Sequence, residues 1–90
     1  MKTYKYSSAG RRPVLAQCPR DAAEIFALRF ARERFGRRAT VRTLHCNCHS
    51  VDGTVHEYES FVGLRTDPHT VTGRAVYFTV TFRGEAEGGR

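Results

Sequence analysis

Apolar residues recur at the spacing of an α-helix in one long stretch of this chain. Between Asp21 and Gly36, alanines and phenylalanines follow one another at intervals of three or four positions, which places them on one broad face. Asp21 is a good N-cap, Glu24 three residues later completes an acidic version of the capping box, and Gly36 suits the position just beyond the last turn. The pattern predicts a helix over residues 21–35.

Polar and apolar residues alternate in the segments on either side of this helix. The alternation predicts a short strand over residues 2–8 and three longer strands over residues 40–50, 54–64 and 73–83. Residues 14–17 can add a second short extended piece, which leaves a small N-terminal hairpin as an open alternative. The helix therefore precedes the three longer strands.

The Asp52-Gly53 pair between two of these strands is a strong signal for a β-hairpin. A two-residue turn would place cysteines opposite glutamates. A three-residue loop with a left-handed Gly53 instead places Cys46 opposite Tyr58 and His45 opposite Glu59. We predict the second register because it groups apolar residues with apolar ones.

These elements predict an α+β fold in which one helix packs on one face of an antiparallel sheet of three to four strands, in the order β-α-β-β-β. We expect residues 1–90 to form a single domain, with a short strand in residues 1–8 and a flexible tail in residues 84–90. The predicted core consists of Phe26, Phe30, Phe35, Leu44, Cys46, Tyr58, Val62, Val76, Phe78, Val80 and Phe82. The predicted opposite face of the sheet carries His45, Asn47, His49, Glu57, Glu59, Tyr77, Thr79 and Thr81.

The formal net charge of +6 is distributed unevenly along the chain. Residues 1–42 carry 11 lysines and arginines against 3 acidic residues, a balance of +8, whereas residues 43–90 carry 4 arginines against 6 acidic residues, a balance of −2. Of the 15 basic residues, 13 are arginine, whose guanidinium group suits two-point contact with phosphate or carboxylate. The first half of the chain is therefore expected to attract polyanions or an acidic protein face.

Arginines of the helix, of the turn after it and of the N-terminal turn are the candidate binding residues. We predict that they meet an acidic protein surface or the phosphates of a nucleic acid. Tyrosines at 4, 6 and 77 are weaker candidates for stacking on bases. The predicted binding residues are Arg11, Arg12, Arg29, Arg32, Arg34, Arg37 and Arg38.

Three cysteines, Cys18, Cys46 and Cys48, are expected to be reduced thiols, because the count is odd and no secretion signal precedes them. Cys46 and Cys48 would point the same way on a regular strand, away from the neighbouring histidines at 45 and 49. A zinc site would need Cys18 and His56 to join them in space, and we predict no metal and no cofactor.

Catalysis is also not predicted. Cys18, near the start of the helix, is the best placed of the thiols for a nucleophile, and Cys48 with His56 is a conceivable pair. The sequence contains no phosphate-binding glycine loop and no serine elbow. It also lacks the roughly 18 consecutive apolar residues of a membrane helix. We therefore predict a cytoplasmic, non-enzymatic protein, and a homodimer is compatible with the bare sheet face.

The stretch from Asp21 to Phe30, followed by the hairpin around Asp52-Gly53, is similar in organisation to small phage- or mobile-element-encoded inhibitors of CRISPR effectors. This resemblance to anti-CRISPR proteins rests on the size, the net positive charge and the β-α-β-β-β order of the elements. The similarity in topology extends over most of the chain. Because these inhibitors share no common fold or sequence signature, it assigns no functional residue. The resemblance implies a non-enzymatic inhibitor that, in the host cytoplasm, docks on an acidic patch of a CRISPR effector subunit or holds DNA where it is unproductive.

Overall fold

The computed structural model of the chain describes residues 2–65 and 71–85. It contains one helix and five strands in the order β-β-α-β-β-β. Their bounds are β1 Tyr4–Ser7, β2 Val14–Ala16, α1 Pro19–Phe35, β3 Thr40–His49, β4 Val55–Arg65 and β5 Val71–Glu85. The strands on either side of the last loop are longer than predicted, because β4 continues to Arg65 and β5 begins at Val71. The predicted tail was wrong at its start, since residues 84 and 85 belong to β5. Residues 66–70 of the loop and 86–90 of the predicted tail lie outside the described residues.

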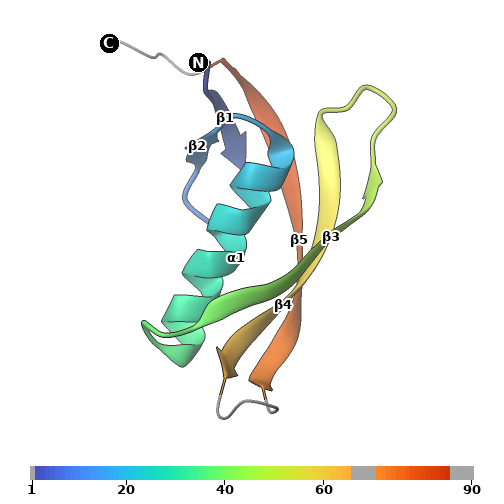
Figure 1. Ribbon diagram of the computed structural model, residues 1–90. Coiled ribbons are helices and arrows are strands. Elements are labelled where there is room, and N and C mark those ends of the chain that lie inside the picture. The colour runs from blue at the N-terminus through green and yellow to red at the C-terminus, as the bar shows by residue number, and fades with distance from the viewer. Residues whose placement is uncertain (1, 66–70, 86–90) are drawn as a thin grey trace.

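The five strands form a single antiparallel sheet in the order β2-β1-β5-β4-β3, with α1 packed against one face (Figure 1). The predicted α+β class and the single helix are confirmed. The sheet has five strands instead of three to four, because the N-terminal hairpin forms and β1 pairs with β5 at the centre of the sheet. The first strand, β1, is thus paired with the last strand, β5. Residues of the loop between β1 and β2 lie beside the helix.

The helix begins two residues earlier than the sequence pattern predicts. Pro19 occupies its first turn, where the missing N–H of proline costs nothing, and Cys18 takes the extended cap conformation. The Cys18 carbonyl accepts the first helical bond from the Ala22 N–H at 3.1 Å. Asp21 therefore lies inside the first turn, where its carboxylate faces the positive end of the helix dipole, and does not cap it. Gly36 ends the helix as predicted, with φ of 100° and its N–H donating to the Arg32 carbonyl at 3.0 Å.

The register of the β3–β4 hairpin is confirmed in its inner part and wrong near the turn. Cys46 lies opposite Tyr58 and His45 opposite Glu59, as predicted. A bulge between Cys46 and Cys48 then leaves residue 47 unpaired, so that Cys48 lies opposite Glu57 and His49 opposite His56. The extra residue reverses the two faces beyond it. His49 therefore lies on the helix side of the sheet, Cys48 lies on the opposite side, and the predicted Cys48–His56 pair does not form.

The turn that closes this hairpin is organised around the carboxylate of Asp52. Its Oδ1 accepts hydrogen bonds from Ser50 Oγ at 2.6 Å, from the Thr54 backbone N–H at 3.0 Å and from Thr54 Oγ1. Gly53 has φ of 76°, the left-handed conformation expected for it. Bonds from Ser50 and Thr54 lower the pKa of Asp52 from its ordinary value of 3.8 to about 2.

The carboxylate of Asp52 should make the hairpin turn acid-sensitive at very low pH. Because the pKa of Asp52 is lower in the folded state, its contribution to stability is present above about pH 4 and is lost as pH falls towards 2. We expect the Thr54 amide proton signal in an NMR titration to report a midpoint near pH 2. Asp52→Asn should remove this transition, and a midpoint near 4 in the natural protein would contradict the hydrogen-bonding pattern.

The hydrophobic core lies between α1 and the helix side of the sheet. Of the predicted core residues, Phe26, Tyr58, Val62, Val76, Phe78 and Val80 are buried, and the remaining ones are half-buried around them. The prediction missed the contribution of the N-terminal hairpin, where Tyr6, Val14 and Ala16 are buried. Alanines make the helix face thin, so the sheet approaches the helix closely. The buried helix alanines are Ala22, Ala23, Ala27 and Ala31.

Candidate anion-binding surface

The arginines predicted to bind a partner come from three segments of the chain. Arg11 and Arg12 lie in the loop between β1 and β2, and Arg37 and Arg38 lie in the turn between α1 and β3. The other three are on the second half of α1. We call the set of Arg11, Arg12, Arg29, Arg32, Arg34, Arg37 and Arg38 the arginine surface.

Arg11 lies over two aromatic rings of the core. Its guanidinium carbon lies 5.4 Å from the centre of the Phe30 ring and 5.8 Å from that of the Phe78 ring. Both distances are within the range of a cation–π interaction, which stabilises a cation over the negative face of an aromatic ring. The side chain is half-buried, so it is held by the core and still reaches solvent.

Arg29 connects the helix to the β1–β2 loop. Its Nη1 donates a hydrogen bond to the backbone carbonyl of Arg12 at 3.3 Å, which brings Arg11, Arg12 and Arg29 to one place. Together with Gly10, Phe26 and Glu33 they line a hollow of about 170 Å³, large enough for a small anionic group. The structure therefore assembles part of the predicted set into a shaped, basic depression.

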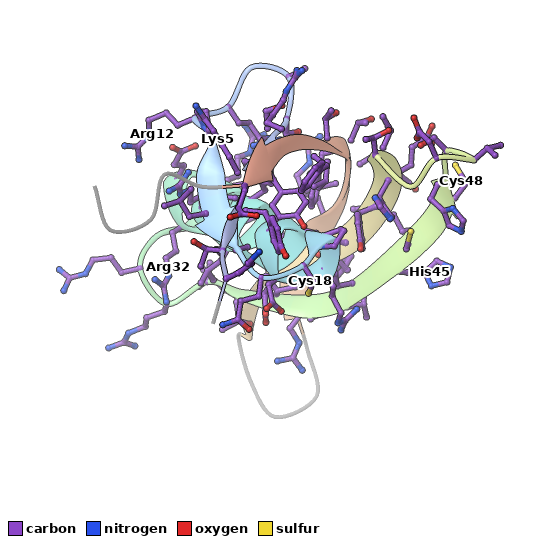
Figure 2. All side chains as sticks on the ribbon, turned by 90° about the horizontal axis from the view of Figure 1, so that it is seen from above. Lys5, Arg12, Cys18, Arg32, His45 and Cys48 are labelled. Atoms are coloured by element: carbon purple, nitrogen blue, oxygen red, sulfur yellow. The ribbon has the colours of Figure 1, made fainter. Side chains whose placement is uncertain are left out.

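The other members of the arginine surface are exposed to solvent. Arg32 and Arg34 project from the last turns of α1, and Arg37 and Arg38 follow directly after Gly36. Figure 2 shows Arg12 and Arg32 projecting from one side of the molecule, and His45 and Cys48 projecting from the opposite side. These exposed arginines extend the basic area beyond the hollow without forming a second enclosed site.

Acidic residues do not neutralise this area at short range. Among the side chains that the structure describes, the one ion pair within 4.0 Å joins Lys2 to Glu85 at 3.3 Å. Glu57 and Glu59, the acidic residues of β4, lie on the sheet face that points away from the helix. Glu33 lines the hollow but lies farther than ion-pair distance from its arginines. The positive charge is therefore available to a partner.

One basic residue near this surface was missed from the sequence. Arg74 lies on the helix side of β5, opposite Val62, with its guanidinium carbon 5.9 Å from the centre of the Phe30 ring that Arg11 also contacts. The signal was present, because Arg74 shares the alternation of Val76 and Phe78. Other arginines have local structural roles: Arg20 donates to the Leu44 carbonyl at 3.4 Å, and Arg83 donates to Ser7 Oγ at 2.7 Å.

The cysteines do not form the zinc site considered from the sequence. The bulge in β3 places Cys46 and Cys48 on opposite faces of the sheet, and Cys18 lies at the start of α1. Within residues 2–65 and 71–85 no group of three or more metal-binding side chains comes together. Desolvation, followed by the negative charge of Glu57, raises the pKa of the Cys48 thiol, which is the reverse of what a thiolate nucleophile needs.

Comparisons with protein-family models, with curated proteins and with solved structures give no match for this chain. Among the helices that the structure describes, none is both long and apolar enough to cross a membrane. What the protein binds must therefore be inferred from its own surface.

Proposed function

We propose that this protein is a non-enzymatic binding domain that holds a nucleic acid through phosphate contacts made by the arginine surface. The observation that carries the proposal is the grouping of Arg11 and Arg12 with Arg29 of α1 around one hollow, with no described carboxylate within ion-pair distance of them. Guanidinium groups bind phosphate by two parallel hydrogen bonds, and a nucleic acid offers many phosphates in a row.

The spread of the arginines suits an extended ligand. Arg29 and Arg32 lie on the same side of α1, and at about 1.5 Å of rise per residue they are about 4.5 Å apart along the helix axis. That distance is on the order of one nucleotide step of about 3.4 Å along one strand. Arg11 and Arg12, which adjoin Arg29, lengthen the contact. The hollow beside Arg29 would hold one phosphate, and the exposed arginines would hold its neighbours.

The aromatic residues support contact with the backbone of the nucleic acid and not with its bases. Tyr6 is buried, and Tyr4 packs on Phe82 with ring centres 5.6 Å apart. Tyr77 is exposed, but it lies on the opposite face of the sheet from the arginine surface. Because no stacking platform adjoins the arginines among the described residues, we expect binding with little sequence preference and strong salt dependence.

An acidic protein surface is the second candidate, and one observation favours it. Ile25, Leu28 and Val41 are half-buried around a shallow hollow between α1 and β3, close to Arg29 and Arg32 in the sequence of the helix. Protein interfaces combine an apolar centre with arginine at their edges. This arrangement is what an inhibitor resembling anti-CRISPR proteins would use on an acidic subunit of an effector complex.

Salt-dependent binding to duplex DNA tests the first candidate. We expect a 20-base-pair fluorescent duplex to bind at about 50 mM salt, with log K falling linearly against log salt at a slope of roughly −0.9 per phosphate contact. Arg32→Gln should reduce that slope by about one contact.

Arg83→Gln is the matched control, because it removes the same charge from the sheet face away from α1. Absence of binding at about 50 mM salt, or an equal loss in both variants, would rule out the proposed surface. If Leu28→Ala instead abolished capture of an acidic protein complex while DNA binding was absent, the second candidate would replace the first.

A further inference from the structure

Two histidines face each other at the end of the β3–β4 hairpin, far from the arginine surface. His49 and His56 are direct cross-strand partners because the bulge in β3 moves His49 to the helix side of the sheet. Their ring centres are 5.7 Å apart and their ring planes are inclined by 39°. This end of the hairpin extends beyond α1, so the helix does not cover it (Figure 1).

The separation of the two rings fits a metal ion held between them. A zinc–nitrogen bond is about 2.1 Å long, and a ring nitrogen lies about 1.1 Å from its ring centre, so each ring centre would lie about 3.2 Å from the ion. At a tetrahedral angle the two ring centres would then be about 5.2 Å apart. The observed 5.7 Å needs only a small rotation of the exposed His49 side chain.

The hydrogen bonding of the rings favours the same arrangement. His49 Nδ1 lies 3.2 Å from the carbonyl oxygen of Ser50, which accepts a hydrogen bond when the ring carries its proton on Nδ1 and leaves Nε2 free to bind a metal. Second-shell bonds of this kind orient most metal-binding histidines. His56 Nδ1 is a buried nitrogen with no hydrogen-bond partner. A buried polar atom without a partner is unfavourable, and a bond to a metal would satisfy it.

We propose that His49 and His56 bind a divalent transition-metal ion such as Zn²⁺, Ni²⁺ or Cu²⁺. Neutral imidazole is a ligand that suits all three ions. No third histidine, cysteine or acidic residue completes a cluster among the described residues, so water or a partner molecule supplies the remaining ligands. The site thus has open coordination positions, and its occupancy is independent of the arginine surface.

Thermal unfolding with the metal ion alone tests this site. At pH 7.5, we expect Zn²⁺ at about ten times its dissociation constant to raise the melting temperature by roughly 5–10 °C. His49→Asn should abolish this rise, and because His49 is exposed this variant should still fold. His45→Asn is the matched control, since it removes an exposed histidine from the opposite face of the same strand.

The result that would overturn the proposal is an absence of a metal-dependent rise in the natural protein, or an equal rise in His49→Asn. Because exposed thiols also bind these ions, Cys48→Ser should be measured in parallel and should keep the full rise. Loss of the rise in Cys48→Ser would assign the metal to the thiol. Isothermal titration of the same variants with ZnCl₂ gives the stoichiometry, which should be one ion per chain.

Discussion

Alanine in place of Gly63 should cause the largest loss of stability of any single substitution considered for this protein. Gly63 on β4 lies directly opposite Gly73 on β5, and it is buried. A Cβ atom on Gly63 would overlap the carbonyl oxygen of Thr72 and would lie 2.5 Å from the Cα of Gly73. Both obstacles belong to the backbone of the neighbouring strand, so no side-chain rotation relieves them.

The expected cost is roughly 3–5 kcal/mol, a large part of the 5–15 kcal/mol that stabilises a typical domain. Urea denaturation followed by circular dichroism measures it. Gly53→Ala is the control, because a Cβ there meets nothing within 4 Å and only the left-handed conformation opposes it. We expect that control to cost about 1 kcal/mol. Equal stability of Gly63→Ala and the natural protein would show that β4 and β5 are less close than described.

Alanine in place of Phe26 should produce a loss of stability of comparable size. Phe26 is 1% exposed and is the largest fully buried side chain of the protein among the described residues. Its ring meets that of Phe78 edge-on, with centres 6.2 Å apart, so that it connects α1 to the central strand of the sheet. Truncation removes this contact and leaves a cavity, because the backbones on either side cannot close around the missing ring.

We expect Phe26→Ala to lower the free energy of unfolding by about 3–5 kcal/mol. Leu28→Ala on the same helix is the comparison, since Leu28 is half-buried beside a surface hollow and its loss should cost clearly less. Urea denaturation of both variants under identical conditions gives the two free energies of unfolding to be compared. A larger effect at Leu28 would mean that the helix packs through a different face. The exposed arginines should keep their places in Leu28→Ala, which makes it usable in binding assays as well.

The sequence predicted the elements whose signals are local. The apolar period and Gly36 set the end of the helix, and the Asp52-Gly53 pair set the hairpin. Two features were missed. Pro19 is a local signal for the first turn of a helix, but the prediction gave more weight to the capping pattern at Asp21. The bulge at residue 47, which reverses the faces of Cys48 and His49, has no local signal. Strict alternation cannot reveal an inserted residue, because the pattern on each side of it remains regular.

The arginine surface could be predicted as a set of residues but not as a site. The arginines from Arg29 to Arg38 were grouped because they are close in the sequence. Arg11 and Arg12 approach Arg29 only because β1 pairs with β5. The cation–π contacts of Arg11 likewise require Phe30 and Phe78 to meet from different elements. The net charge of a segment can be counted from its sequence. The hollow beside Arg11, Arg12 and Arg29 exists only once the sheet and the helix have packed together.

The two outer strands of the sheet also determine how the molecule behaves in a crowded solution. β2 has three residues, and β3 is interrupted by irregular pairing near residues 42 and 47. A short or irregular outer strand offers no continuous row of N–H and C=O groups that a strand from another molecule can extend. The two edges of this sheet therefore present little continuous backbone to which a strand of another molecule could pair.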